Sequence, residues 1–363
     1  MQTSPLDSDN IPHSTRTSAP MNSAMPVQAQ KNQRFKFHGH ASEYFGIWIV
    51  NILLIIITLT LYAPWAKVRR LRYFYRNTEL LQRRFDFTGL PSKIFIGRMI
   101  ALVAVIIVTY ITNYSLEITG IGFLLLYTLM PWLIRSSLRF RARNSKFGNS
   151  RMYFSGSNKQ AYSVFIICVA IYFLTLGLFY PVMIWLYKRY SFDYLQIGQL
   201  KFEFKATWGN FMSAVYFPIF LLVLMSFALA IAFFALGLSL ANMKSVLTLV
   251  AVFYVAVIAF IWPLIQARLF IATWNNVTLS RSYFTTNANQ WFYAWIVLSN
   301  WIAKILTIGL LTPWAAIRLY KYQLESLNLY LRNDPDLLVN ELQNDPNAIA
   351  EEMADLFDFD VSL

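Results

Sequence analysis

Three polar or charged side chains lie inside apolar stretches of this sequence, where they are costly to place. Lys304 lies within the apolar run 291–312, and an ammonium group deep in a membrane is by default a functional candidate. It could contact a substrate or an ion, or it could reach the membrane surface if the run is tilted or turns back. Asn51 and Asn300 also lie in apolar runs. There, an amide either hydrogen-bonds a neighbouring helix or lines a transport path.

Three prolines, Pro64, Pro181 and Pro313, close apolar runs. Helices that break near a proline free backbone groups that can coordinate ions or substrate. Proline also marks ordinary helix ends, and that alternative stays open. Together with Asn51, Asn300 and Lys304, these prolines are the predicted transport-path residues.

Basic side chains follow these prolines and alternate with aromatic residues. The formal net charge of the chain is +13. The bases lie beside apolar runs, which suits contact with anionic lipid head groups and argues against nucleic acid as a partner. The predicted head-group contacts are Lys67, Arg69, Arg70, Arg72, Lys188, Arg189, Arg318 and Lys321.

The sequence contains no arrangement typical of an enzyme. We find no nucleophile beside a base, no phosphate-binding glycine loop and no metal-ligand spacing. His38 and His40 have only Glu43 nearby, which is weak evidence for a metal. Cys168 is the single cysteine, so an intrachain disulfide is excluded. We therefore expect no catalytic residue, metal or cofactor, and a protein that is not an enzyme.

The sequence around the prolines recurs three times at fixed spacing. Each proline has a Thr six residues before it, a basic residue eight after it and a Tyr nine after it. The sets are Thr58, Pro64, Arg72 and Tyr73; Thr175, Pro181, Arg189 and Tyr190; Thr307, Pro313, Lys321 and Tyr322. Three copies at fixed spacing predict internal repeats. We place the repeat units at 34–151 and 152–283, with a partial third at 284–331.

Hydrophobic residues make up 57% of the chain, which indicates a membrane protein. Seven apolar runs are long enough to cross a bilayer. They lie at about 44–63, 94–113, 118–134, 162–184, 211–238, 246–266 and 291–312. We predict an all-α multi-pass transmembrane fold with internal repeats and seven apolar segments. Short cytoplasmic strands are expected to flank them, for example at 34–39, 84–87 and 201–204.

The orientation of the segments that end at the prolines has two solutions. If all seven segments span, the second repeat is inverted relative to the first, as in many transporters. If these segments turn back, the strands share one side of the membrane with almost all of the bases. We favour the second solution on the distribution of bases, although backbone that turns back within a membrane must be buried in protein or line a wet cavity.

The two ends differ in composition from the body. Residues 1–33 are polar and predict a disordered tail rather than a signal peptide. The tail 332–363 is acidic and includes Leu356 and Phe357 among its acids. It is either a solvated tail or an amphipathic helix that docks on the basic body.

Residues 35–91 include Phe35-Lys-Phe-His-Gly39, Tyr62-Ala-Pro-Trp65 and Arg84-Phe-Asp-Phe87. This combination resembles the YjgN-like family of bacterial inner-membrane proteins, and the resemblance covers most of 35–331. It implies a multi-pass location in the bacterial inner membrane. The family has no established activity, so the resemblance supplies no catalytic residues.

The sequence supports two functions from different classes. The first is permeation or transport of a small solute. The alternative is a non-transporting membrane scaffold or a protein that binds anionic lipids. In both cases membrane lipids are the expected partners, and the C-terminus is expected in the cytoplasm.

Overall fold

The computed structural model describes residues 31–112, 116–235 and 243–332, and in this part of the chain pairs of helices alternate with β-hairpins. The helices are α1 (Ala41–Ile57), α2 (Ala63–Arg76), α3 (Pro91–Thr112), α4 (Leu116–Arg143), α5 (Asn158–Leu174), α6 (Tyr180–Asp193), α7 (Trp208–Ala235), α8 (Met243–Trp274), α9 (Gln290–Leu306) and α10 (Thr312–Glu325). The strands are β1 (Lys31–Arg34), β2 (Lys36–Phe37), β3 (Thr78–Leu80), β4 (Arg83–Phe87), β5 (Ser145–Phe147), β6 (Ser150–Phe154), β7 (Leu195–Ile197), β8 (Leu200–Phe204), β9 (Val277–Leu279), β10 (Ser282–Thr286) and β11 (Leu327–Leu331).

All of these strands belong to one antiparallel sheet that nearly closes into a barrel. The described strands run in the order β1-β11-β10-β9-β8-β7-β6-β5-β4-β3-β2. β1 and β2 are two parts of one extended segment, interrupted at Phe35. Because β1 pairs with β11 and β2 pairs with β3, this first segment joins the two ends of the sheet.

Aromatic side chains fill the inside of this sheet. Alternating burial along β8 directs Phe202 and Phe204 inward. Phe35 stacks between Phe85 and Phe284, with 6.4 Å between the ring centroids in both pairs. Phe202 stacks on Phe284 at 6.2 Å. The interior is therefore a packed hydrophobic core rather than an open channel.

The prediction of an all-α fold is wrong, because an eleven-stranded sheet forms the core of the described molecule. The strands are likewise not short cytoplasmic pieces beside membrane segments. They pair with one another along the whole chain. The two strands of each hairpin are close in the sequence, but the pairs that join one hairpin to the next, such as Phe87 with Ser145, are not. A short strand carries little signal of such a distant partner, so pattern alone could not assemble this sheet.

The prediction of seven spanning-length segments is also wrong. Within the described residues, three helical stretches are long and apolar enough to cross a membrane: Pro91–Tyr110, Trp208–Ala232 and Val250–Trp274. Ala41–Ile57 and Asn158–Leu174 are apolar but shorter. The predicted runs 44–63, 162–184 and 291–312 are each divided between two helices by a tight turn before the proline.

These three turns have the same geometry. The hydroxyls of Thr58, Thr175 and Thr307 each donate to the carbonyl four residues earlier, at 2.6–2.7 Å. Each hydroxyl oxygen then accepts the amide four residues later, at 3.0–3.2 Å. The next two residues have positive φ, ending at Thr60, Gly177 and Gly309. This left-handed pair ends the first helix, and the proline begins the second at a position where its missing N–H is not needed.

The recurring tyrosines fasten each proline helix to the start of its partner. The Tyr73 hydroxyl donates to the His40 carbonyl at 2.9 Å. The Tyr190 and Tyr322 hydroxyls donate to the Ser157 and Asn289 carbonyls in the same way. His40, Ser157 and Asn289 are the N-caps of α1, α5 and α9.

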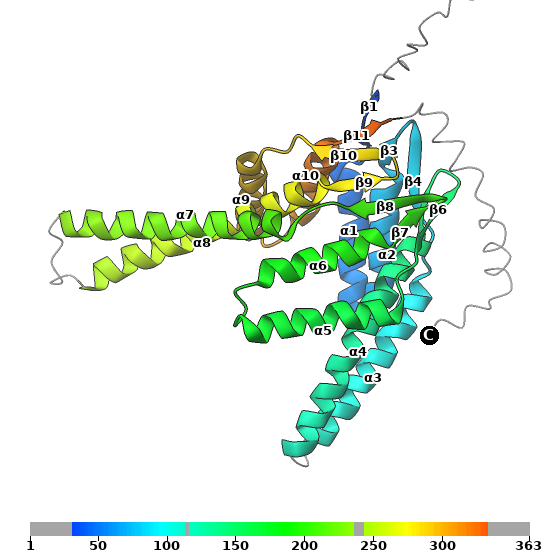
Figure 1. Ribbon diagram of the computed structural model, residues 1–363, viewed down its shortest axis with the longest axis horizontal. Coiled ribbons are helices and arrows are strands. Elements are labelled where there is room, and N and C mark those ends of the chain that lie inside the picture. The colour runs from blue at the N-terminus through cyan, green and yellow to red at the C-terminus, as the bar shows by residue number, and fades with distance from the viewer. Residues whose placement is uncertain (1–30, 113–115, 236–242, 333–363) are drawn as a thin grey trace, which may run out of the picture.

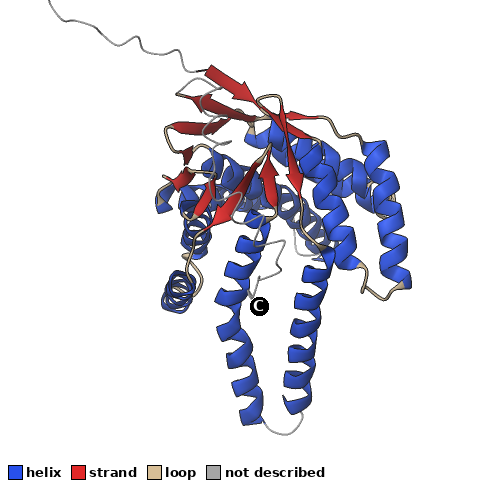
Figure 2. Ribbon diagram, turned by 90° about the vertical axis from the view of Figure 1, so that its right-hand side faces the viewer, coloured by secondary structure: helices blue, strands red, loops and turns tan. Residues whose placement is uncertain are grey.

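The helices form a ring on one side of the sheet. Each described helix contacts the next in chain order, and α10 contacts α1. Figure 2 shows the strands gathered at one end with helices running away from them. The pairs α3/α4 and α7/α8 project furthest, as two separate arms with α5/α6 between them (Figure 1).

Candidate lipid-headgroup site

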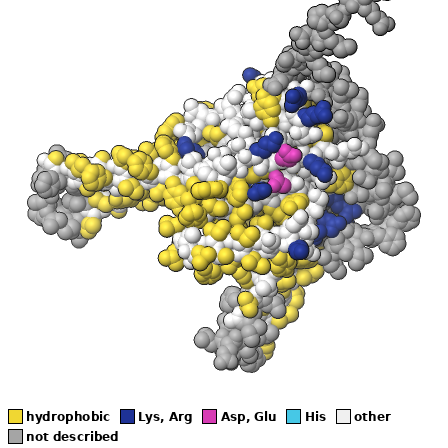
Figure 3. All heavy atoms as spheres, in the orientation of Figure 1, with side chains coloured by type: hydrophobic (Ala, Val, Ile, Leu, Met, Phe, Trp, Pro, Cys, Tyr) yellow, Lys and Arg dark blue, Asp and Glu magenta, His cyan; other side chains and the backbone are white. Residues whose placement is uncertain are grey.

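The turns of the three short helix pairs expose large aliphatic side chains. Leu59, Leu176 and Ile308 are 85%, 89% and 96% exposed. Each adopts positive φ, so the backbone itself holds the side chain away from the helices. Exposed clusters of this kind are typical of surfaces that contact a membrane or another protein. Figure 3 shows hydrophobic side chains covering α5/α6 and the α7/α8 arm, while Lys and Arg gather nearer the sheet.

Three basic side chains on α2, α3 and α4 lie near enough to one another for their charges to interact. They are Lys67 of α2, Arg98 of α3 and Arg141 of α4, and all three are exposed residues. Partial burial of the Lys67 amine lowers its pKa, and the nearby charges of Arg141 and Arg98 lower it further. Within the described ranges, none of the three forms a salt bridge with an acid. We call these residues the α2–α4 basic cluster.

Arg72 fixes the connection from which this cluster arises. Its Nε donates to the Phe87 carbonyl at 3.3 Å, and one terminal nitrogen donates to the Gly89 carbonyl at 3.2 Å. These bonds tie α2 to the end of β4, just before α3 begins at Pro91. Arg72 therefore holds the connection that precedes α3, and two of its nitrogens are engaged in doing so.

Four of the other predicted head-group residues fall into two groups. Arg189 and Lys321 pair with the acids Asp193 and Glu325, one helical turn away, at 3.3 and 3.9 Å. Arg69 lies over the Tyr62 ring and Arg70 over the Phe74 ring, at 5.6 and 5.8 Å, with no acidic partner among the described residues.

Lys188 differs from these surface bases because it is largely buried. Burial lowers the pKa of its amine, and no hydrogen bond or ion pair joins it to the described chain. A buried ammonium without a partner is costly, so Lys188 is a poor candidate for contact with a head group at the surface.

Asn300 occupies a structural position in the fifth helix pair. Its Nδ2 donates to the Ala315 carbonyl at 3.1 Å, and its Oδ1 accepts from Arg318 at 3.2 Å. Arg318 also donates to the Ser299 hydroxyl at 2.8 Å and lies over the Trp314 ring. The amide thus joins α9 to α10 and fixes the Arg318 side chain.

Asn51 and Lys304 have no comparable contacts. Asn51 is buried in α1, and its Oδ1 has no hydrogen-bond partner. Lys304 lies in the last turn of α9 and is half-buried. Pro64, Pro181 and Pro313 are buried at the starts of α2, α6 and α10.

Two cavities lie elsewhere in the helix ring. One, of about 290 Å³, lies between α4, α5 and α6 and is mainly apolar. The other, of about 210 Å³, lies between α7, α8 and α9 and is polar; Arg268 lines it and donates to Gln290 at 2.8 Å. Neither is lined by Asn51, Asn300 or Lys304.

The sequence alone does not link Arg98 to Lys67 and Arg141. The usable signal was that Arg98 lies a few residues inside an apolar run, while the neighbouring runs are bordered by bases. A metal site is not found among the described residues, which contain no group of three or more His, Cys, Asp or Glu side chains. His38 instead pairs with Glu79 at 2.9 Å.

Comparison with known proteins identifies a family. A family described as "Bacterial protein of unknown function (DUF898)" matches residues 32–356. The inner membrane protein YjgN of Salmonella typhimurium is 30% identical over 148 residues, which cover 39% of this chain and 36% of that protein. YjgN of Escherichia coli K12 is 31% identical over 126 residues, covering 34% and 32%.

The match therefore spans about a third of the length of these curated relatives. No solved structure matches the chain. The relatives' names, together with the three apolar helices, place the chain in the bacterial inner membrane. The resemblance expected from the sequence is confirmed.

Proposed function

The chain belongs to the DUF898 family of bacterial proteins of unknown function, and we propose from its own geometry that it binds anionic phospholipids of the inner membrane through the α2–α4 basic cluster. The observation that carries this proposal is the convergence of Lys67, Arg98 and Arg141 without an acidic partner in the described chain. Arg98 lies in the first half of the apolar stretch Pro91–Tyr110, and its charge acts on Lys67 together with that of Arg141.

The chemistry of these side chains suits a lipid phosphate. Guanidinium groups bind phosphate oxygens through two parallel hydrogen bonds, and an ammonium adds a point charge. An anion between the three cations would relieve the repulsion that lowers the pKa of Lys67. Each base near an anionic membrane surface contributes about 1 kcal/mol.

The surrounding helices support the same role. α3 carries Arg98 on a stretch long enough to cross a membrane, so the guanidinium is held beside lipid rather than in bulk water. The exposed aliphatic turns at Leu59, Leu176 and Ile308 supply further surface for contact with acyl chains. Two ion pairs lie at the sheet instead: Arg76, the last residue of α2, pairs with Asp86 of β4, and Lys205 pairs with Glu203 of β8.

A charge-neutralising variant tests the proposal. The triple substitution Lys67→Gln, Arg98→Gln and Arg141→Gln should weaken binding of phosphatidylglycerol relative to phosphatidylcholine by at least roughly tenfold, since about 1 kcal/mol per base is lost. Native mass spectrometry of the full chain, titrated with each lipid, measures the two affinities.

The matched control removes the same charge from the sheet. Arg34→Gln, Lys36→Gln and Lys201→Gln alter three exposed strand residues. This control should keep the preference for phosphatidylglycerol. If both triple variants lose the preference equally, net charge rather than the cluster is responsible and the proposal fails.

Solute transport, the first function expected from the sequence, stays a prediction. No contact of Asn51, Asn300 or Lys304 favours it, and the two cavities described above do not include these residues. Its direct test is a flux in proteoliposomes that is lost in Lys304→Ala.

A further inference from the structure

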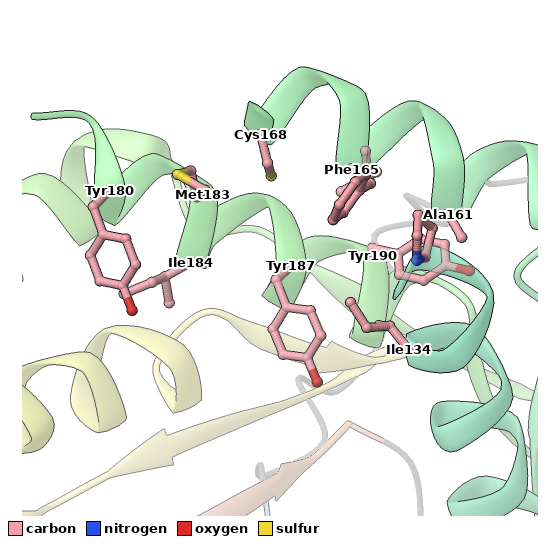
Figure 4. Close-up of a pocket in the computed structure, with 11 residues that line it drawn as sticks. Ile134, Ala161, Phe165, Cys168, Tyr180, Met183, Ile184, Tyr187 and Tyr190 are labelled. Carbon is pink, nitrogen blue, oxygen red and sulfur yellow. The ribbon is translucent and has the colours of Figure 1, made fainter. Parts of the chain in front are cut away.

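The cavity between α4, α5 and α6 has the apolar lining of a site for a hydrocarbon chain. Its volume is about 290 Å³, and its wall includes Ile134, Phe165, Cys168, Met183 and Tyr187 (Figure 4). The small side chain of Ala161 leaves room beside Tyr190 at one end, and Tyr180 borders the other. A cavity with so few polar partners does not retain ordered water.

The cavity borders a surface that faces lipid. Two of its wall residues, Tyr180 and Tyr187, are exposed at the molecular surface. The same helix pair presents Ile166, Phe173 and Leu174 outward, with Leu174 84% exposed. In the inner membrane this surface meets acyl chains, so an apolar occupant can enter sideways from the bilayer.

A fixed positive charge lies at the sheet end of the cavity. Arg135 follows the wall residue Ile134, and its Nε donates to the Gly156 carbonyl at 2.7 Å. Burial raises the pKa of the neighbouring Tyr190 to about 12, against the opposing effect of the Arg135 charge. No acid of the described chain forms a salt bridge with Arg135, and no described group accepts from its terminal nitrogens. An anionic group can therefore bind there.

From this pairing of an apolar cavity with an anchored cation, we infer that the cavity holds one acyl chain of a phospholipid whose phosphate is bound by Arg135. The chain runs along α5 and α6 past Cys168. This site is separate from the α2–α4 basic cluster and does not depend on it.

The rate of Cys168 alkylation can report, in the wild-type protein, whether the cavity is occupied. It is the single cysteine of the chain and lies on the cavity wall (Figure 4). In nanodiscs of phosphatidylglycerol, alkylation of Cys168 by a membrane-permeant maleimide should be about tenfold slower than in phosphatidylcholine, whose choline ammonium offsets the phosphate charge and so weakens the charge-assisted contact with Arg135. Equal rates in the two lipids would overturn the inference.

Two substitutions in α5 distinguish a lipid bound inside the cavity from a lipid bound on the outer face of that helix. Photo-crosslinking with a phosphatidylglycerol that carries a diazirine in its acyl chain should label cavity-wall residues, as mapped by peptide mass spectrometry. Ala161→Phe fills the cavity and should remove this labelling. Ala170→Phe makes the same change at an exposed position of α5 and should leave it unchanged. Labelling that persists in Ala161→Phe contradicts the inference.

Two substitutions in α4 test the role of the Arg135 charge. Arg135→Gln should abolish the difference in Cys168 alkylation between the two lipids, whereas Arg139→Gln, at an exposed residue one turn further along α4, should preserve it. The triple variant of the basic cluster should also keep Cys168 protected. Loss of lipid binding at the α2–α4 basic cluster would therefore leave Cys168 protected, so the two experiments distinguish failure of the proposed function from failure of this inference.

Discussion

At the scale of single residues, the recurring polar positions act mainly within their own helix pairs. The three Thr hydroxyls close the turns and the three Tyr hydroxyls hold the N-caps. Sequence spacing identified these positions, because the same turn demands the same residues each time. It could not assign their contacts, since a hydroxyl that bonds a carbonyl within its own pair gives the same pattern as one that faces a ligand.

The two buried asparagines provide a matched pair for a prediction. Asn300→Ala leaves the Ala315 carbonyl and the Arg318 side chain without their amide partner. This should lower the free energy of unfolding by about 1–2 kcal/mol. Asn51→Ala removes an amide whose Oδ1 has no partner and should cost clearly less. Thermal unfolding in detergent, followed by circular dichroism, measures both; a larger loss in Asn51→Ala would refute this assignment of Asn300.

At the scale of elements, the left-handed turns decide how apolar runs become helices. A hydropathy profile shows runs such as 44–63 as continuous, because Leu59 and Thr60 are not residue types typical of turns. Strands do occur at β2, β4 and β8, where aromatic and polar residues alternate. The other strands span three to five residues without this alternation of aromatic and polar residues as a guide. The cluster of Lys67, Arg98 and Arg141 depends on where separate helix pairs lie against each other. Neither these strands nor the basic cluster can be predicted from the local sequence pattern.

Equivalent positions in the three turns carry different residues, which gives a second stability prediction. Thr60 has φ +73°, whereas the equivalent Gly177 and Gly309 have φ +82° and +86°. A β-branched residue is strained there, so Thr60→Gly should raise the free energy of unfolding by up to about 1 kcal/mol, while Gly177→Ala should lower it by a similar amount.

Gly46→Ala is the control for these turn variants. An added Cβ at Gly46, inside α1, meets nothing within 4 Å, so alanine should stabilise the helix slightly. Thr60→Gly and Gly46→Ala should therefore raise the melting temperature, and Gly177→Ala should lower it. Destabilisation by Thr60→Gly would mean that the threonine side chain contributes contacts that outweigh its backbone strain.

At the scale of the whole molecule, one sheet collects every described helix pair on one side. The closure depends on the segment around Phe35, which pairs with both the last strand and β3. Sequence analysis could identify an inner-membrane protein and its aromatic-polar strands. The closure does not follow from the sequence pattern, because the first extended segment pairs both with β3 and with β11, the last strand of the described chain.

This architecture predicts the relative depths of the parts of the molecule in the bilayer. The central claim, that the α2–α4 basic cluster binds lipid phosphates, requires the cluster to lie at the membrane surface. The turn at Leu59 should then lie in the hydrocarbon and the sheet should lie in water.

Depth measurement by electron paramagnetic resonance tests that claim most directly. On a Cys168→Ser background, single spin labels are placed at Leu59, at Gly97 beside Arg98, and at Lys36 on β2, in phosphatidylglycerol-containing liposomes. We expect oxygen, but not an aqueous nickel complex, to reach the label at Leu59. The label at Gly97 should lie near the phosphate plane, and the nickel complex should reach the label at Lys36 freely. A Gly97 label deep in the hydrocarbon, or well out in water, would contradict it.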